Sequence, residues 1–550
     1  MDTIKLTIDN REVEVPRGTT ILKAAEQMGI KIPTLCHFEL DGLALENRPG
    51  GCRVCVVEVV GRRNLAPACI TECMPDMVVK TNSFRALNAR RTVLELMLSD
   101  HPNDCLQCPK SGKCELQALA ADMGIRDIPY KGQQSQYAKE FSPSIVRDAN
   151  KCIMCRRCES VCHEYQSVGA IGAIERGFPA VVSTAFGKNL TDTNCVLCGQ
   201  CVAVCPTGAL AEVDNTGKIL RDIANPNVKT CVQVAPAVRV ALGEEFGMPA
   251  GSIVTGKIAA ALKAIGFDYV FDTDWSADLT IMEEGTELLG RIKNGGTLPM
   301  ITSCSPGWIN YCEKFYPEFL PNLSTCKSPH EMEGAMIKTY WAEKAGIDPK
   351  DIRVVSVMPC TAKKFEAKRP ELGHDGMQDV DEVITTRELA RMIKEAGIDF
   401  ANLPDEDFDP MLGESTGAAV IFGATGGVME AALRTVYEIM TESKIEPEEV
   451  EDNDIFTTVK EATIKVGDLD VNVAVAHGTA NAAKLLDSIR SGEKTYHFIE
   501  VMACPGGCVT GGGQPIVSAQ KRMECDPKAL RAAALYLESI FTSDQLFTTL

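Results

Sequence analysis

Eight cysteines stand in two runs of equal spacing, and their thiols are well suited to hold metal. The runs are Cys152-x2-Cys155-x2-Cys158-x3-Cys162 and Cys195-x2-Cys198-x2-Cys201-x3-Cys205. In this spacing three thiolates bind one [4Fe–4S] cluster and the fourth reaches a second cluster. Zinc ribbons pair two C-x2-C units and do not extend each run with a fourth ligand. The repeat therefore predicts two [4Fe–4S] clusters that carry electrons.

Four more cysteines lie near the start of the chain, in a segment with strand-like alternation. Residues 4–15 read as a hairpin and 19–28 as a helix. The cysteines follow at Cys36, Cys52, Cys55 and Cys69. Gly50 and Gly51 beside the C-x2-C pair let backbone N–H groups approach cluster sulfur. We predict a [2Fe–2S] site here, with mononuclear zinc as the alternative.

A third set of donors combines one imidazole with three thiols, after a helical segment over residues 90–98. It consists of His101, Cys105, Cys108 and Cys114. Such a set suits a Cys3His zinc site, and the spacing alone leaves zinc open. Its position between two iron–sulfur modules favours a [4Fe–4S] cluster, because redox-silent zinc would interrupt electron transfer. A neutral histidine ligand makes the cluster less negative, which raises its potential.

From about residue 228 strand-like runs alternate with helical ones, which predicts an α/β domain of about 300 residues. The strand-like runs are 231–242, 269–271, 354–358, 418–422, 471–476 and 498–502. Sites in open α/β sheets gather beyond the carboxyl ends of the strands. Cys360 and Cys504 each directly follow such a run.

Composition limits the class of protein. The 550 residues are 45% hydrophobic with a net charge of −19, which argues against nucleic acid or anionic membrane as partner. No run reaches the roughly 18 apolar residues that a membrane span requires. The 24 cysteines are clustered in a long chain that opens without a leader-like segment. These features predict a cytoplasmic protein whose thiolates hold metal.

Three segments of the second half closely resemble the signature motifs of the iron-only ([FeFe]) hydrogenases, and the cluster-bearing first half is similar to the longer members of that family. The segments are Thr302-Ser303-Cys304-Ser305-Pro306-Gly307-Trp308, 358–366 and 500–513. The resemblance implies that a buried cubane is held by Cys304, Cys360, Cys504 and Cys508. It also implies that Cys508 bridges the cubane to a di-iron unit with CO, cyanide and a dithiolate, together the H-cluster. Hydrogen would then be split heterolytically at an open iron position, with the dithiolate amine as base.

The first segment departs from the family in one position. Members usually have adjacent cysteines, the second binding the cubane and the first offering a thiol for proton transfer, whereas this chain has Cys304-Ser305. Either Cys304 keeps the proton role beside an unusual Ser305 ligand, or Cys304 binds the cubane. We favour ligation by Cys304, because thiolate is the better iron ligand.

The resemblance implies further roles around the cofactor. Lys363 would donate to one cyanide, which has the right polarity for a cationic donor. The backbone of Pro236 and Ala237 would meet the other cyanide, although Ala237 stands where the family often has serine. The residues implied to line an apolar pocket are Met358, Met502 and Phe422.

A proton route is implied by three polar residues that match the family's carboxylate–hydroxyl relay. They are Glu284, Glu287 and Ser324. Glu284 and Glu287 are three apart, so they share one face of a helix. Without the resemblance, a solvated acidic face would be the simpler interpretation. His330 stands where many members have glutamine, and five cysteines (Cys73, Cys231, Cys312, Cys326 and Cys525) have no assigned cluster.

Together these patterns predict a multidomain α+β and α/β chain with one [2Fe–2S] cluster, three [4Fe–4S] clusters and the H-cluster. The expected parts are a [2Fe–2S] ferredoxin-like β-grasp domain (1–80), a His/Cys3 domain (81–123), a two-[4Fe–4S] ferredoxin domain (140–215), an α/β H-cluster domain (225–525) and a short C-terminal tail (526–550).

Electrons would pass between the H-cluster and ferredoxin or a flavin- and NAD(P)-binding partner subunit, in a hetero-oligomer similar to the multimeric NAD(P)-linked or electron-bifurcating hydrogenases. The alternatives are a hydrogenase-like iron–sulfur scaffold protein and a complex I-type electron-transfer subunit. The second alternative shares the N-terminal cluster pattern but would lack the three C-terminal motifs.

Overall fold

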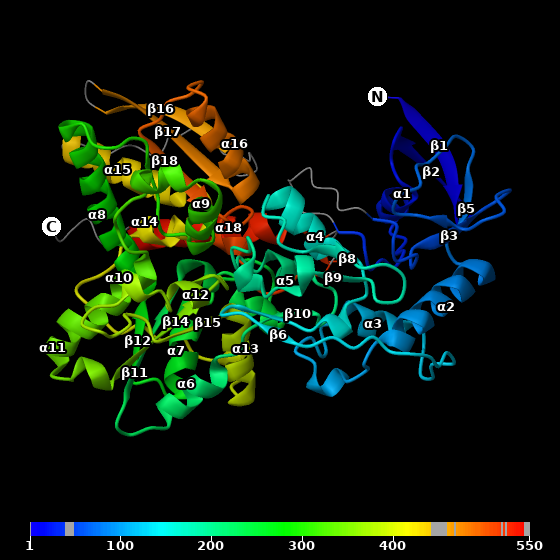
Figure 1. The fold of residues 1–550 in the computed structure, drawn as a ribbon, viewed down its shortest axis with the longest axis horizontal. Coiled ribbons are helices and arrows are strands. Elements are labelled where there is room, and N and C mark those ends of the chain that lie inside the picture. The colour runs from blue at the N-terminus through cyan, green and yellow to red at the C-terminus, as the bar shows by residue number, and fades with distance from the viewer. Residues whose placement is uncertain are drawn as a thin grey trace.

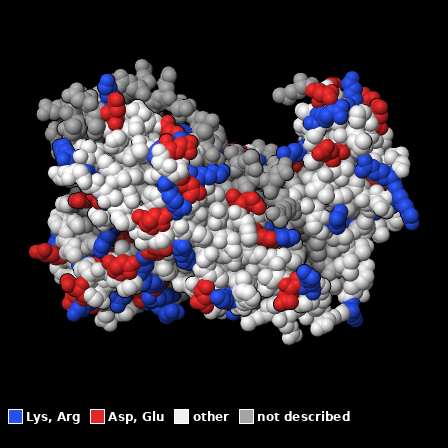
Figure 2. All heavy atoms as spheres, turned by 45° about the horizontal axis from the view of Figure 1, so that its top comes forward, with Lys and Arg blue, Asp and Glu red and all other residues white. Residues whose placement is uncertain are grey.

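The chain forms a line of modules that leads from a small N-terminal lobe to a large C-terminal domain (Figure 1). The computed structural model describes residues 2–38, 49–441, 459–466, 469–518, 521–522 and 525–543. In surface view the N-terminal module stands apart from the rest as a separate lobe (Figure 2). Across the described residues, no helix combines the length and the apolar run needed to cross a bilayer.

The N-terminal lobe is a five-stranded sheet in the order β2-β1-β5-β3-β4, covered by one helix. The strands are β1 (Thr3–Ile8), β2 (Arg11–Pro16), β3 (Val56–Val59), β4 (Ala66–Pro67) and β5 (Val78–Lys80), and the helix is α1 (Ile21–Gln27). The first two strands form the predicted antiparallel hairpin, while β5 runs parallel to β1. Thr20 caps α1 by accepting from the backbone of Lys23. This mixed sheet agrees with the β-grasp prediction.

Two cluster modules connect this lobe to the large domain. The first contains α2 (Phe84–Asp100) and α3 (Glu115–Asp122); the second contains α4 (Arg157–Ser160), α5 (Gln200–Val204), β6 (Glu140–Phe141), β7 (Ile145–Arg147), β8 (Gly172–Ile174), β9 (Val181–Ser183) and β10 (Leu210–Glu212). Arg157 joins the modules, because its guanidinium donates to both carboxylate oxygens of Glu115 at 2.9 Å.

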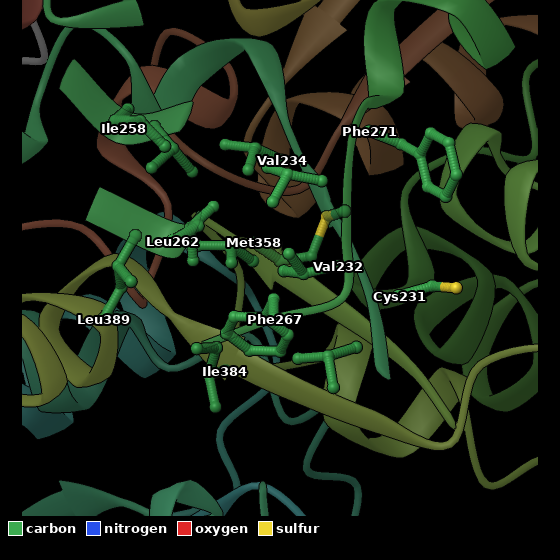
Figure 3. Packing of buried hydrophobic residues seen from close by; sticks show 14 of the residues in the cluster. Cys231, Val232, Val234, Ile258, Leu262, Phe267, Phe271, Met358, Ile384 and Leu389 are labelled. Carbon is green, nitrogen blue, oxygen red and sulfur yellow. The ribbon is translucent and has the colours of Figure 1, made fainter. Parts of the chain in front are cut away.

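The large domain is built on two four-stranded sheets. The first sheet is fully parallel and has the order β12 (Tyr269–Asp272), β11 (Lys229–Val234), β14 (Ile352–Met358) and β15 (Glu382–Thr385). Helices α6 (Thr216–Ile223), α7 (Thr255–Ile265) and α13 (Thr386–Glu395) contribute to the apolar core around it. Figure 3 shows Val232 and Val234 of β11 among Ile258 and Leu262 of α7 and Leu389 of α13.

The second sheet has the order β13 (Met300–Ile301), β18 (Phe498–Met502), β17 (Leu469–His477) and β16 (Val459–Val466). Its first three strands are parallel, and β16 pairs antiparallel with β17. The helices of this half and of the link between the sheets are α8 (Thr273–Asn294), α9 (Pro306–Phe315), α10 (Pro329–Met336), α11 (Ala342–Ala345), α12 (Lys363–Glu366), α15 (Gly427–Thr441) and α16 (Thr479–Arg490).

Two segments of the large domain differ from the local structure expected from the sequence. The run 418–422, expected to be strand-like, is helical: α14 (Gly417–Val420) continues into a 3₁₀ turn at Ile421–Gly423. Its small residues let it pack closely against α8 and α18. The tail expected from residue 526 contains α18 (Pro527–Ser543), which packs on the large domain through Ala532 and Leu535.

Glycines allow the two-cluster module to contact the large domain backbone to backbone. A Cβ at Gly512 would lie 2.3 Å from the carbonyl oxygen of Cys198 and 2.8 Å from Cα of Gly199. A Cβ at Gly199 would in turn lie 2.2 Å from Oγ1 of Thr361. Side chains at these positions would push the modules apart, so glycine sets this short separation.

We expect Gly512→Ala to destabilise this contact by about 1–3 kcal/mol, because backbone atoms of the neighbouring module cannot yield as a flexible side chain would. Gly290→Ala is the matched control: Gly290 lies inside α8 with no atom within 4 Å of the added Cβ. The control should be neutral or stabilising by about 0.5–1 kcal/mol. Thermal unfolding followed by circular dichroism would compare them, and equal midpoints for both variants would contradict this account.

Candidate functional site: a thiol-lined cavity and its proton and electron routes

Four cysteines from three distant segments line one cavity. They are Cys304, Cys360, Cys504 and Cys508. The fold brings them together because the carboxyl ends of β11, β13, β14 and β18, from both sheets, open onto this cavity. Cys360 follows β14 and Cys504 follows β18, as their sequence positions predicted.

The thiols are buried close to one another, which makes their anionic forms costly. Burial first, then repulsion from Cys360, Cys198 and Cys508, raises the pKa of Cys504. Burial and Cys360 likewise raise the pKa of Cys508 to about 12. A bound cation removes this cost, because coordination stabilises the thiolate. A set of soft thiol donors converging in a buried cavity fits an iron–sulfur cubane.

Cys304 and Ser305 have different neighbours within this cavity. Burial first, and then the negative charge of Glu284, raises the pKa of the Cys304 thiol. Oγ of Ser305 instead accepts a hydrogen bond from the backbone N–H of Ala503 at 3.3 Å, next to Cys504. Both side chains line the cavity.

The other predicted cofactor contacts lie on the wall of the same cavity. They are Pro236, Ala237, Met358, Met502 and Phe422. Nζ of Lys363, also on this wall, lies 2.7 Å from a Glu366 carboxylate oxygen and donates to the carbonyl of Cys304 at 3.1 Å. Burial opposes the charge on Lys363, but Glu366 outweighs it and raises the pKa of the ammonium group. The cavity therefore combines apolar walls with one fixed cation.

The two-cluster module reaches this cavity directly, because Cys198 is one of its lining residues. The eight cysteines of that module divide into the two groups expected from their spacing. A second cavity is lined by Cys152, Cys155, Cys158 and Cys205. Burial and then repulsion from Cys201, Cys195 and Cys162 raise the pKa of Cys198, which places these four together. Each run thus contributes its fourth cysteine to the other group.

The His/Cys3 module contains a buried nitrogen that lacks a protein partner. Nε2 of His101 has no hydrogen-bond partner among the described residues, while its Nδ1 accepts from the backbone of Asn103 at 3.4 Å. Burial lowers the pKa of His101, so the ring is neutral and able to bind metal. A Cβ at Gly208 of the two-cluster module would lie 2.4 Å from Sγ of Cys108. The orphaned nitrogen and the close approach fit a cluster at this junction.

The four N-terminal cysteines are buried together. Sγ of Cys55 lies 3.3 Å from Sγ of Cys69. Hydrogen bonds from the thiols of Cys52 and Cys69 lower the pKa of Cys36. Cys55 and Cys69 thus share one site with Cys36 and Cys52, as the [2Fe–2S] prediction requires.

The three predicted proton-relay residues lie next to one another on and beside α8. Oγ of Ser324 donates to Glu287 at 3.2 Å, and the backbone N–H of Thr325 donates to the same oxygen at 3.0 Å. Burial opposes ionisation, but Thr325 and Arg291 lower the pKa of Glu287. Glu284 is 1% exposed, and no residue in the described ranges donates in good geometry to its carboxylate. Burial raises the pKa of Glu284 to about 7.

One group at the cavity was not predicted from the sequence. His330 lines the cavity and contacts the buried carboxylates of Glu366 and Glu331. The only sign of His330 in the sequence was that it stands where many family members have glutamine. No role follows from that difference alone.

The raised pKa of Glu284 predicts a pH-dependent cost in stability. Below pH 4.5 the carboxyl is protonated in both states; from there to about pH 7 only the unfolded state releases its proton. Wild-type stability should therefore fall with rising pH relative to Glu284→Gln, by about 3 kcal/mol at pH 8. Unfolding of the two proteins at pH 5 and pH 8 measures this difference, which isolates Glu284 from other groups. A difference that does not change with pH would contradict the prediction.

Comparison with known proteins agrees with the predicted kinds of domain. Residues 228–512 match the model of the iron only hydrogenase large subunit, C-terminal domain. The preceding parts match a 2Fe-2S iron-sulfur cluster binding domain (1–83), the NADH-ubiquinone oxidoreductase-G iron-sulfur binding region (90–129) and a 4Fe-4S dicluster domain (151–209). The predicted multidomain fold is thus confirmed.

Two relatives are similar to this chain over nearly its whole length. The NADP-reducing hydrogenase subunit HndD of Solidesulfovibrio fructosivorans is 56% identical over 94% of this chain and 89% of its own length. Iron hydrogenase 1 of Clostridium pasteurianum is 41% identical over 96% of this chain and 92% of its own length. A solved structure of a variant of the [FeFe]-hydrogenase HydA1 from Chlamydomonas reinhardtii matches 59% of this chain and 89% of its own chain at 41% identity, with a TM-score of 0.52. This chain therefore belongs to the iron-only hydrogenases, and its reaction is the reversible oxidation of molecular hydrogen to protons and electrons.

Proposed function

We propose that the thiol-lined cavity holds the H-cluster, with Cys360, Cys504 and Cys508 among the ligands of its cubane. The observation that carries this proposal is the meeting of four cysteines from three segments in one buried cavity, with Cys198 of the two-cluster module on the same wall. When bound, the di-iron unit supplies an open iron position and a basic amine at which hydrogen is split. The second and third motifs and the residues of the proton route speak against a scaffold protein, which would hold a cubane without the di-iron unit. The three C-terminal motifs speak against a complex I-type electron-transfer subunit.

The residues around the cavity would each act on one part of this chemistry. Lys363 is held by Glu366 and offers a fixed cation to an anionic diatomic ligand. Met358, Met502 and Phe422 are nearly fully buried and exclude water from the reacting position. Pro236 and Ala237 also line the cavity. Dry apolar walls strengthen the interaction of Lys363 with its ligand.

Protons would move between the cavity and solvent through Glu284, Ser324 and Glu287. Glu284 has a pKa of about 7, so it can both take up and release a proton near neutral pH. The charge of Glu284 acts on the Cys304 thiol, which supports a thiol at the inner end of this route. We keep thiolate ligation of the cubane as the other role proposed for Cys304, with Ser305 lining the same cavity.

Electrons would pass from the partner through one [2Fe–2S] cluster and three [4Fe–4S] clusters to the H-cluster, or in the reverse direction. The ligands proposed for the first are Cys36, Cys52, Cys55 and Cys69, and those proposed for the cluster after it are His101, Cys105, Cys108 and Cys114. The remaining two clusters take the two groups of the ferredoxin module. The short separations at Gly208 and at Gly512 support close spacing along this route.

We further propose that the chain works as the catalytic subunit of a hetero-oligomer with a flavin- and NAD(P)-binding partner subunit. HndD, similar over nearly the full length, is named as a subunit of an NADP-reducing hydrogenase. Free ferredoxin is the alternative electron partner. Thiols held for iron in place of disulfides fit a reducing compartment, so we propose the cytoplasm as its location.

The N-terminal lobe has a surface that would suit such a partner. Next to the cysteines, Ile70 and Met74 are about half exposed, and Phe84 at the start of α2 is 86% exposed. Arg62 reaches Sδ of Met74 at 3.5 Å, and Arg85 donates to the carbonyl of Arg63. Residues 60–87 carry four basic and two acidic side chains, whereas the whole chain has a net charge of −19. An apolar patch with a basic rim favours an acidic partner surface.

The proton route predicts that Glu284→Gln lowers hydrogen–deuterium exchange with water by about 10²-fold or more in matured protein, because the amide cannot exchange a proton. Glu283→Gln is the matched control, because Glu283 precedes Glu284 in the sequence but its side chain is exposed. Infrared bands of CO and cyanide report whether each protein contains the H-cluster. Wild-type protein that shows only its N-terminal clusters and no exchange activity would refute the proposed site.

The partner surface predicts that Arg62→Glu with Arg85→Glu slows hydrogen-driven NADP⁺ reduction by about tenfold or more at low salt, because charge reversal repels an acidic partner. Reduction of a small viologen dye should not change, as it needs no docking. Arg11→Glu, on the edge strand β2, is the control for added negative charge. Unchanged NADP⁺ reduction in the double variant would exclude this surface.

A further inference from the structure

The buried imidazole of His330 belongs to neither the proton route nor the electron route. His330 is 1% exposed, lines the cavity and lies in the first turn of α10, directly after Pro329. Nε2 of Gln233 on β11 donates to the carbonyl of His330 at 2.8 Å, and Oγ of Ser356 on β14 lies 3.2 Å from its Nδ1. Gln233 and Ser356 are partners in the register of these two strands. The parallel sheet therefore fixes both the backbone and the ring of His330.

The hydrogen bonds of the ring define its tautomer. Nε2 of His330 lies 2.7 Å from Oε2 of Glu366. Burial opposes ionisation of Glu366, but Lys363 and His330 lower its pKa to about 2, so this carboxylate can only accept hydrogen bonds. Nε2 must therefore donate, and because burial lowers the pKa of His330 to about 4, the ring is neutral. In the neutral ring Nδ1 is the acceptor, and the hydroxyl of Ser356 donates to it.

One oxygen of Glu366 is shared between His330 and Lys363. Nζ of Lys363 lies 2.7 Å from the same Oε2 and donates at 3.1 Å to the carbonyl of Cys304. In the described part of the chain these two oxygens are the acceptors for the ammonium group. An ammonium group has three N–H donors, so one of them remains for a ligand in the cavity, whose wall Lys363 helps to form.

The N–H of His330 limits how Glu366 can hold Lys363. Because Oε2 accepts from two donors in different directions, the carboxylate is held in one orientation. Without the imidazole donor, the carboxylate would be free to turn and to accept two N–H groups of Lys363, one with each oxygen. The low dielectric of a dry cavity would strengthen such a doubly bonded ion pair, which would then compete with a ligand for the ammonium group. The imidazole thus keeps one N–H of Lys363 available.

We propose that His330 is a positioning residue, which holds Glu366 so that Lys363 keeps one N–H for a cyanide of the di-iron unit. The inference rests on the proposed function, because the cyanide belongs to the H-cluster. The series of contacts runs from Ser356 in the sheet through His330 and Glu366 to Lys363. Each link is a hydrogen bond of 2.7 to 3.2 Å. No proton moves along this series, so it acts only on the direction and the availability of the lysine donor.

A metal ion is the other partner that these side chains suggest. One ligand atom each of His330, Glu331 and Glu366 lies within 4.8 Å of the others. A divalent cation there would meet the ammonium of Lys363, which already lies 2.7 Å from Oε2 of Glu366, and the two cations would repel each other. Burial, and then the charge of Glu366, raises the pKa of Glu331 to about 9, so this acid is neutral at pH 7 and a poor ligand. The contacts therefore favour hydrogen bonding over metal binding.

The test compares the infrared spectra of matured wild type, His330→Leu, His330→Gln and Ser356→Ala. Leucine fills the site without a donor, whereas the amide of glutamine can donate to Glu366 as the imidazole does. One of the two cyanides would contact Lys363, so we expect His330→Leu to displace one cyanide band and to leave the other in place. His330→Gln should return the displaced band to its wild-type position. Ser356→Ala removes only the donor to Nδ1 and should displace the same band by less.

The control is His477→Leu, at an equally buried histidine whose Nδ1 lies 3.0 Å from the hydroxyl of Tyr165 instead. This variant should leave both cyanide bands at their wild-type positions. Unchanged cyanide bands in both His330→Leu and Ser356→Ala would overturn the inference, and so would equal displacements in His330→Leu and His330→Gln. Wild-type protein that shows no CO or cyanide bands after maturation would refute the proposed function itself, and the inference with it.

Discussion

The cost of burying thiolates is the constraint on which this structure depends. An anionic sulfur far from water is strongly disfavoured, and at Cys504 the neighbouring thiols Cys360, Cys198 and Cys508 add repulsion to burial. Iron repays this cost, since a coordinated thiol is held as the thiolate. The same reasoning applies in the N-terminal lobe and the two-cluster module. The clusters are therefore structural elements as well as carriers of electrons, because folding and metal binding are coupled.

The two sheets determine which segments supply the cysteines of the cavity. Parallel strands place the residues after their carboxyl ends at one edge, and here β11, β14, β13 and β18 direct these ends to one cavity. Glycine completes the arrangement where the backbone must come close. At Gly512 any side chain would meet the backbone of Cys198 and Gly199, so the last cluster module lies directly against the cavity wall. The route for electrons is thus short because backbones, and not side chains, form the contact.

Much of this arrangement could be predicted from local sequence, but not all. Cysteine spacing identified the two groups in the ferredoxin module, because the ligands are close in sequence and their exchange follows from geometry. The strands before Cys360 and Cys504 were evident from their apolar runs. The run 418–422 was mistaken for a strand, because a short apolar run has no period that separates a strand from a buried helix. The surroundings of His330 could not be predicted, because its ring contacts Glu366, which is distant in sequence.

A dry cavity and a reaction that consumes protons impose opposite demands, and buried acids reconcile them. Apolar walls at Met358, Met502 and Phe422 keep water away, so water cannot supply protons in bulk. In the proposed function titratable side chains carry the protons instead, and burial sets the pKa values of these side chains. The pKa of Glu284 is raised to about 7, while that of Glu287, held by Thr325 and Arg291 nearer the surface, is lowered. The same burial that makes the thiols require iron thus makes these carboxyls able to hold and release protons near neutral pH.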